Sequence, residues 1–258
     1  MPRFQKPKIA QFTYVIHFKD TQEKIRWAQG DAEVAFGSFG AGQSQQTNVP
    51  DNVDPSVPRI LFMKDNRNIA ISQQAVQLTH TFDAKATPPL DGQLEELRQE
   101  IGTFYEQALE FERDRPYGSA SLIVIVNFGA ESTTEELHKF VFERFIKFDP
   151  LGDLASVQFA VGFKAGDFYV NLNGAVYETR QFEMTQQIRG PITPANLLQS
   201  AQHAKLLGRG VQFTVDINDR PRFAVKGPQP RLVKPDSLFD RAKQIITAKL
   251  PSIIDGAN

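Results

Sequence analysis

Hydrophobic positions along the chain follow two different periods, which separate predicted strands from predicted helices. Residues 9–18 (IAQFTYVIHF) alternate between the two sides of an extended chain, which predicts a strand with one buried face. In residues 91–112 apolar side chains recur every three or four positions and glutamates occupy the other faces, which predicts an amphipathic helix. The continuous apolar stretch in residues 121–128 predicts a well-buried strand. A sheet covered by helices follows from these segments.

Further elements are predicted in the second half. Ser-Thr-Thr-Glu predicts a helix that begins at Ser132 or Thr133, with a capping box that includes Glu135. The remaining predicted elements are a helix over 193–208, a strand over 211–218 and a helix over 235–250 that Pro251 ends.

One hairpin-like segment occurs twice along the chain. Residues 59–82 align with residues 157–182, with turns predicted at Asp65-Asn66 and Ala165-Gly166. Each copy precedes a helix, a strand and a helix, so we expect an internal duplication. The identical positions are Ala75, Val76, Thr79 and Phe82, aligned with Ala175, Val176, Thr179 and Phe182.

These patterns predict an α+β protein of internally duplicated hairpin-helix-strand-helix units, with an antiparallel-rich sheet and helices packed on one side. Residues 1–150 would hold the N-terminal strand, a mobile loop and the first repeat. Residues 151–258 would hold the second repeat, and the two parts can also form one continuous domain. The predicted mobile loop spans residues 37–58, whose Gly, Gln, Asn, Ser and Pro provide few apolar groups to offset the entropy of ordering.

Composition excludes several classes of function. The chain has no cysteine, which excludes disulfides, thiolate metal sites and a cysteine nucleophile. Its 29 basic and 30 acidic side chains give no overall charge that would direct it to nucleic acid or an anionic membrane. The N-terminus lacks the apolar region of a secretory signal, and the longest apolar run is too short for a bilayer. We expect a cytoplasmic protein with no membrane association.

Candidate catalytic and metal-binding residues are few. Asp216, Asn218 and Asp219 lack the glycine and the distal glutamate of a calcium loop, so we expect them to end a strand through hydrogen bonds. We therefore predict no catalytic residue, no metal site and no cofactor. The four histidines are far apart and show no metal-ligand spacing: His17, His80, His138 and His203.

One segment near the C-terminus is strongly basic. Residues 220–234 carry five cations, three prolines and no acid. Such a run can contact an acidic protein surface or phosphates, and a solvated connection before the last helix is the alternative. The candidate partner-binding residues are Arg220, Arg222, Lys226, Arg231 and Lys234.

Three stretches of the chain resemble a sporadically distributed prokaryotic protein family of similar length. They are the opening KPKIAQFTYVIHF, the hairpin RILFMKDNRNIAISQQAVQL with the helix after it, and the closing FTVDIND before LFDRAKQIITAKL. The family has no assigned function. The resemblance therefore implies a bacterial, archaeal or phage source and identifies no catalytic residue.

We expect an interaction protein, not an enzyme, that binds a macromolecular partner through a groove or a sheet edge. Another protein is favoured as this partner over nucleic acid, and the sequence does not determine the oligomeric state. Two alternatives stay open. The 21 phenylalanines also suit a small-molecule binder or enzyme with a Phe-lined cavity between sheet and helices. The basic run also suits a nucleic-acid accessory protein.

Overall fold

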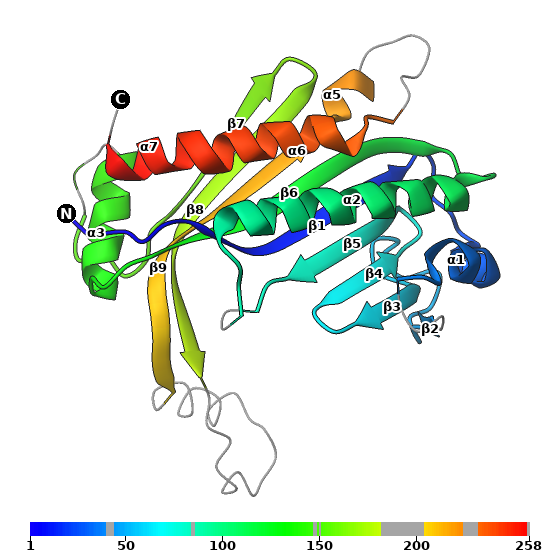
Figure 1. Cartoon of the computed structure of the whole chain (residues 1–258), viewed down its shortest axis with the longest axis horizontal. Coiled ribbons are helices and arrows are strands. Elements are labelled where there is room, and N and C mark those ends of the chain that lie inside the picture. The colour runs from blue at the N-terminus through cyan, green and yellow to red at the C-terminus, as the bar shows by residue number, and fades with distance from the viewer. Residues whose placement is uncertain are drawn as a thin grey trace, which may run out of the picture. The chain divides into compact units, whose positions relative to one another are not determined.

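A computed structural model of the protein describes residues 1–39, 44–83, 86–146, 149, 151–181, 204–223 and 232–256. It confirms a mixed α+β fold with an antiparallel sheet and several helices (Figure 1). The order of the described strands in the sheet is β2-β3-β4-β5-β1-β6-β9-β8-β7.

The strands are β1 (Lys8–Phe18), β2 (Gln45–Gln46), β3 (Ile60–Lys64), β4 (Arg67–Ile71), β5 (Ala75–Thr81), β6 (Tyr117–Gly129), β7 (Gln158–Ala165), β8 (Phe168–Gln181) and β9 (Lys205–Asn218). The helices are α1 (Gln29–Phe36), α2 (Leu90–Glu112), α3 (Thr134–Phe145), α5 (Arg220–Phe223), α6 (Pro235–Gln244) and α7 (Leu250–Asp255). A 3-10 turn, η1 (Ile25–Ala28), precedes α1, and a π-helical turn, η2 (Ile245–Lys249), joins α6 to α7.

The chain divides into two compact units, each assembled from separate stretches of sequence. Unit 1 contains Met1–Pro7, Asn127–Phe159 and Asn173–Phe213. Unit 2 contains Lys8–Val126, Ala160–Leu172 and Thr214–Asn258. The predicted boundary at residue 150 falls inside unit 1.

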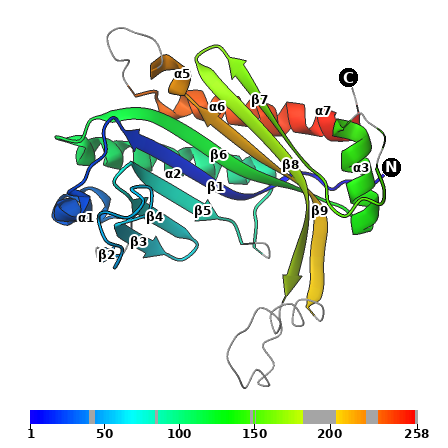
Figure 2. The same cartoon turned by 180° about the vertical axis from the view of Figure 1, so that it is seen from behind.

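Helix α2 covers one face of the strands of unit 2. It contacts β1, β5, α1 and α6, and α2 and α6 lie in front of these strands in Figure 1 and behind them in Figure 2. The Tyr14 ring of β1 meets the Phe104 ring of α2 edge-on, with centroids 5.9 Å apart. The apolar stripe of α2 is buried as its spacing predicts: Leu94, Leu97, Ile101, Phe104, Ala108 and Phe111.

Strands β3, β4, β5 and β1 form consecutive antiparallel pairs. The β3–β4 turn lies at Asp65 and Asn66 as predicted, and Asp65 adopts a φ of 50° there. The Cα atoms of Phe12 and His80 are opposite each other in the β1–β5 pair. Side chains alternate along a strand, so the odd-numbered residues of β1, including His17, lie on the face away from α2.

Two arginines bind the described part of the predicted mobile loop, residues 44–58. Arg59 is fully buried, and its guanidinium donates hydrogen bonds to the carbonyls of Pro50, Val53, Asp54 and Val57. Arg26 donates to the carbonyls of Thr47 and Val49 and to the carboxylate of Asp51. The composition of the loop does not predict this, because all the acceptors except the Asp51 carboxylate are backbone carbonyls and the donors lie outside residues 44–58. The mobility of the segment stays a prediction.

The structure does not confirm the internal duplication. Residues 59–82 contain the three strands β3, β4 and β5, whereas 157–182 contain the single hairpin β7–β8. Val76 is fully buried at the start of β5, but the aligned Val176 is half-buried within β8. Phe182 lies outside the described residues. Ala75 and Ala175 are both half-buried, but the other comparable pairs, Val76 with Val176 and Thr79 with Thr179, differ in burial.

The second hairpin turns one residue later than predicted. Its turn is Gly166-Asp167, and Gly166 has a φ of +66°, a conformation that glycine adopts without a steric penalty. The prediction at Ala165-Gly166 was wrong because it placed glycine second in the turn instead of first.

Helix α3 begins after the N-cap Thr133, one of the two predicted positions, but its capping box and two other helix boundaries differ from the predictions. The capping box of α3 pairs Thr133 with Glu136, one residue later than expected. Residues 205–208 belong to β9 instead of ending a helix, and most of that predicted helix lies outside the described residues. Pro251 does not end the last helix, because the π-helical turn changes the hydrogen-bond register and places Pro251 in the first turn of α7, where a missing N–H is tolerated.

Candidate functional site

The described part of the basic run does not form one set of free cations. Arg220 is exposed, with Nη2 3.5 Å from Nε2 of His17. Arg222 lies 3.5 Å from the carboxylate of Asp219. Lys234 is exposed at the N-cap of α6, and Lys226 and Arg231 lie outside the described residues. The partner-binding role of the run stays a prediction.

Asp219 holds the end of β9 in place, as predicted for a hydrogen-bonded strand terminus. Its fully buried carboxylate accepts a hydrogen bond from the Ala120 N–H at 2.7 Å, and its own N–H donates to the Ala120 carbonyl at 3.1 Å. Burial raises the pKa of this carboxyl, while the Ala120 N–H and the Arg222 guanidinium act in the opposite direction. The contacts with Ala120 and Arg222 give Asp219 a structural role.

Among the described residues, one cluster has the composition of a metal site. The side chains of His80, Glu96 and Glu100 bring their ligand atoms within 4.8 Å of one another. The positive charge of Arg67 already offsets part of the negative charge of the two glutamates, since its guanidinium lies 3.2 Å from Glu100 and 3.8 Å from Glu96. Sequence reasoning missed this cluster because its members come from two elements, strand β5 and helix α2, which only the tertiary structure brings together.

Both ring nitrogens of His80 already have hydrogen-bond partners. The Asn66 amide nitrogen donates to the Thr81 carbonyl at 2.6 Å and lies 2.9 Å from Nε2 of His80. Nε2 is therefore the acceptor, and the proton is on Nδ1, which is 3.1 Å from Glu100. The arrangement fits a partly buried hydrogen-bond network between α2 and the sheet.

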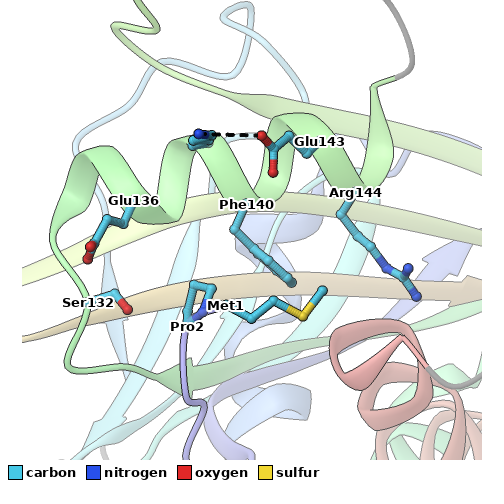
Figure 3. Close-up of a pocket in the computed structure, with 8 residues that line it drawn as sticks. Met1, Pro2, Ser132, Glu136, Phe140, Glu143 and Arg144 are labelled. Carbon is cyan, nitrogen blue, oxygen red and sulfur yellow. Dashed lines mark ion pairs between the residues drawn. The ribbon is translucent and has the colours of Figure 1, made fainter.

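A cavity lies in unit 1, between helix α3 and the N-terminal residues. Figure 3 shows Phe140 and Arg144 directed from α3 toward Met1 and Pro2, and an ion pair between Lys139 and Glu143 on the helix surface. The cavity has a volume of about 440 Å³. Acidic and basic side chains alternate around it, so it has no single charge that would select a class of ligand. Its full lining is Met1, Pro2, Ser132, Glu136, Lys139, Phe140, Glu143 and Arg144.

The two outer strands of the sheet differ in length and exposure. At one end lies β2, which has only two residues. At the other end lies β7, which is labelled in Figure 1. It has eight residues, six of them exposed. Proteins usually shorten or cover an outer strand because its free N–H and C=O groups can pair with another chain. Among the described strands, β7 is the long edge that is not protected in this way.

Apolar side chains on β7 change from packed to exposed along the strand. The Phe159 ring stacks on the Phe145 ring of α3, with centroids 4.1 Å apart. Val161 and Phe163 follow Phe159 on the same face of β7. Val161 is 44% exposed and Phe163 is 52% exposed. The alternating pattern of this strand predicts that these side chains share a face, but it cannot show that the face lacks a cover.

No protein-family model, no curated protein and no solved structure matches the chain. The resemblance to a prokaryotic family therefore stays a prediction. No described helix combines the length and the apolar character that crossing a membrane requires.

Proposed function

We propose that the protein binds another protein, and that an extended segment of this partner pairs with β7 as an additional strand. The observation that carries the proposal is the exposed edge of β7, an eight-residue outer strand with Val161 and Phe163 open to solvent. In strand addition the backbone hydrogen bonds provide affinity, and pockets or apolar contacts for alternate side chains provide specificity.

The turn of the hairpin indicates which backbone groups of β7 are free. In an antiparallel hairpin with a two-residue turn, the residues next to the turn form a hydrogen-bonded pair, and such pairs alternate along the strands. Ala165 and Phe168 are next to the turn, so the odd-numbered residues of β7 pair with β8. The N–H groups of Ala160, Gly162 and Lys164 therefore point toward the open edge.

The side chains of β7 favour a protein segment over a nucleic acid. Nucleic-acid interfaces are rich in cations because phosphate contacts dominate their affinity. The edge strand offers Val161 and Phe163 as exposed apolar groups and Lys164 as its cation. An extended segment with apolar residues at alternate positions matches this surface.

The test begins with peptides selected from a random displayed library on the full-length protein. Strand addition predicts that a bound peptide slows hydrogen exchange at the N–H groups of Ala160, Gly162 and Lys164, measured residue by residue by NMR. Gly162→Pro removes one of these donors and should weaken binding about tenfold, measured by fluorescence anisotropy. Replacing Val161 and Phe163 together by lysine should also weaken binding.

Met63→Lys is the matched control, because Met63 is another exposed apolar side chain, 68% exposed, on a different hairpin. It should leave peptide affinity unchanged. Peptides whose affinity is the same for wild type and Gly162→Pro, or that protect amides elsewhere, would contradict the proposal. Self-association of the protein through β7, detected as a doubled mass in light scattering, would replace the foreign partner by a second copy and would equally contradict it.

A further inference from the structure

A small polar pocket lies in unit 2 on the sheet face away from α2. Its volume is about 230 Å³, below the range of about 300–1,000 Å³ typical of sites for drug-sized ligands. The β-strands β1, β6 and β9 provide its floor through His17, Ser121 and Asp216. Ser56 lines it from the loop bound by Arg59, and Arg220 lines it from α5. This size fits a small metabolite better than a nucleotide.

The pocket contains one cation and one anion that do not pair with each other. Among the described residues, neither Arg220 nor Asp216 has an ion-pair partner of opposite charge. Asp216 is held in position by the Asn171 amide, which donates to it at 2.9 Å. Arg220 contacts the His17 ring instead of an acid. Two opposite charges therefore face the same cavity without neutralising each other directly.

His17 does not change this balance of charge at neutral pH. Burial and the nearby Arg220 guanidinium lower its pKa, and the Asp216 carboxylate opposes this only in part. The ring is neutral at pH 7, so the pocket carries one positive and one negative charge. A polyanion such as a nucleoside polyphosphate would be repelled by Asp216, whereas a ligand with one charge of each sign would satisfy both groups.

We propose that this pocket binds a small zwitterion, a free amino acid, with its carboxylate on Arg220 and its ammonium group on Asp216. The hydroxyls of Ser56 and Ser121 and the ring of His17 supply further polar contacts around the ligand. The assignment is independent of strand addition at β7, since the pocket contains no residue of that strand.

Isothermal titration calorimetry of the full-length protein with each proteinogenic amino acid tests this. At least one should bind, and both Arg220→Gln and Asp216→Asn should weaken it by roughly 10- to 100-fold, because each removes one charged hydrogen-bond partner. Acetate, which carries only the carboxylate, should lose affinity in Arg220→Gln alone. Methylamine, which carries only the ammonium group, should lose affinity in Asp216→Asn alone.

Lys234→Gln is the matched control, because Lys234 is an exposed cation of the same basic run and does not line the pocket. It should bind the amino acid like wild type, and equal unfolding midpoints would show that all variants are folded. Absence of binding at millimolar concentrations for every amino acid would overturn the proposal. Binding that survives both pocket variants, or acetate that binds as tightly as the best amino acid, would overturn it as well.

Discussion

Replacement of Arg59 by alanine should release the segment 44–58 and lower the free energy of unfolding by about 3–5 kcal/mol. Nη1 of Arg59 donates to Val57, and Nη2 is shared among Pro50, Val53 and Asp54 at 3.0–3.3 Å. We count these contacts as two charged hydrogen bonds, each contributing about 1.5–3 kcal/mol, because three of them share one nitrogen. Water that reaches the freed carbonyls reduces the upper end of this range.

The ion pair of Arg59 with Asp51, at 3.5 Å, adds little, because the Asp51 side chain is 47% exposed. Arg59→Lys should cost less than Arg59→Ala, since lysine keeps the charge but loses the planar fork that reaches several carbonyls. Urea unfolding followed by circular dichroism measures the free energies, and limited proteolysis measures exposure of the segment.

Arg98→Ala is the control for loss of an arginine, because Arg98 is 55% exposed and its ion pair with Asp236 should contribute less than about 1 kcal/mol. The reasoning would be refuted if Arg59→Ala destabilised the protein no more than Arg98→Ala. Unchanged cleavage between residues 44 and 58 would show separately that Arg59 does not hold the segment.

Three other predictions rest on single contacts. Phe82→Ala should lower the free energy of unfolding by about 3–5 kcal/mol, because the ring is 8% exposed and stacks on His80; a loss below 1 kcal/mol in urea would contradict this. Thr133→Ala should cost about 1 kcal/mol through the capping box of α3, and an unchanged urea midpoint would count against it. Burial raises the pKa of Asp219 above its ordinary value of 3.8, so the stability that its protonated form provides is present below pH 3.8 and is lost as pH rises through the folded-state pKa. The unfolding free energy of wild type relative to Asp219→Asn should therefore fall over that range in urea titrations, and a constant difference would contradict the shift.

The sequence by itself determined the elements whose pattern is local and continuous. Strand β1 and helix α2 were predicted within a residue or two, because alternation and the three-to-four spacing record which side chains must be buried. The Asp65-Asn66 turn was predicted because its residue types suit that backbone. The hydrogen-bonded end of β9 was predicted because Asp219 lacked the neighbours of a calcium loop.

The tertiary structure decided features that depend on residues far apart in the chain. The sequence similarity between residues 59–82 and 157–182 suggested a duplication. Val76 is nevertheless fully buried and Val176 half-buried, because burial depends on what covers each strand. The anchoring of residues 44–58 depends on Arg26 and Arg59 reaching backbone carbonyls, which no side-chain pattern records.

The candidate sites were decided in the same way. The basic run drew attention to Arg220, but His17 and Asp216, which share its pocket, come from strands β1 and β9. The sequence of an alternating strand such as β7 has the same pattern whether or not another strand pairs with its edge. Its position in the sheet decides whether that edge is paired. Local periodicity therefore identified the elements, and only long-range packing determined which of their surfaces stay open for binding.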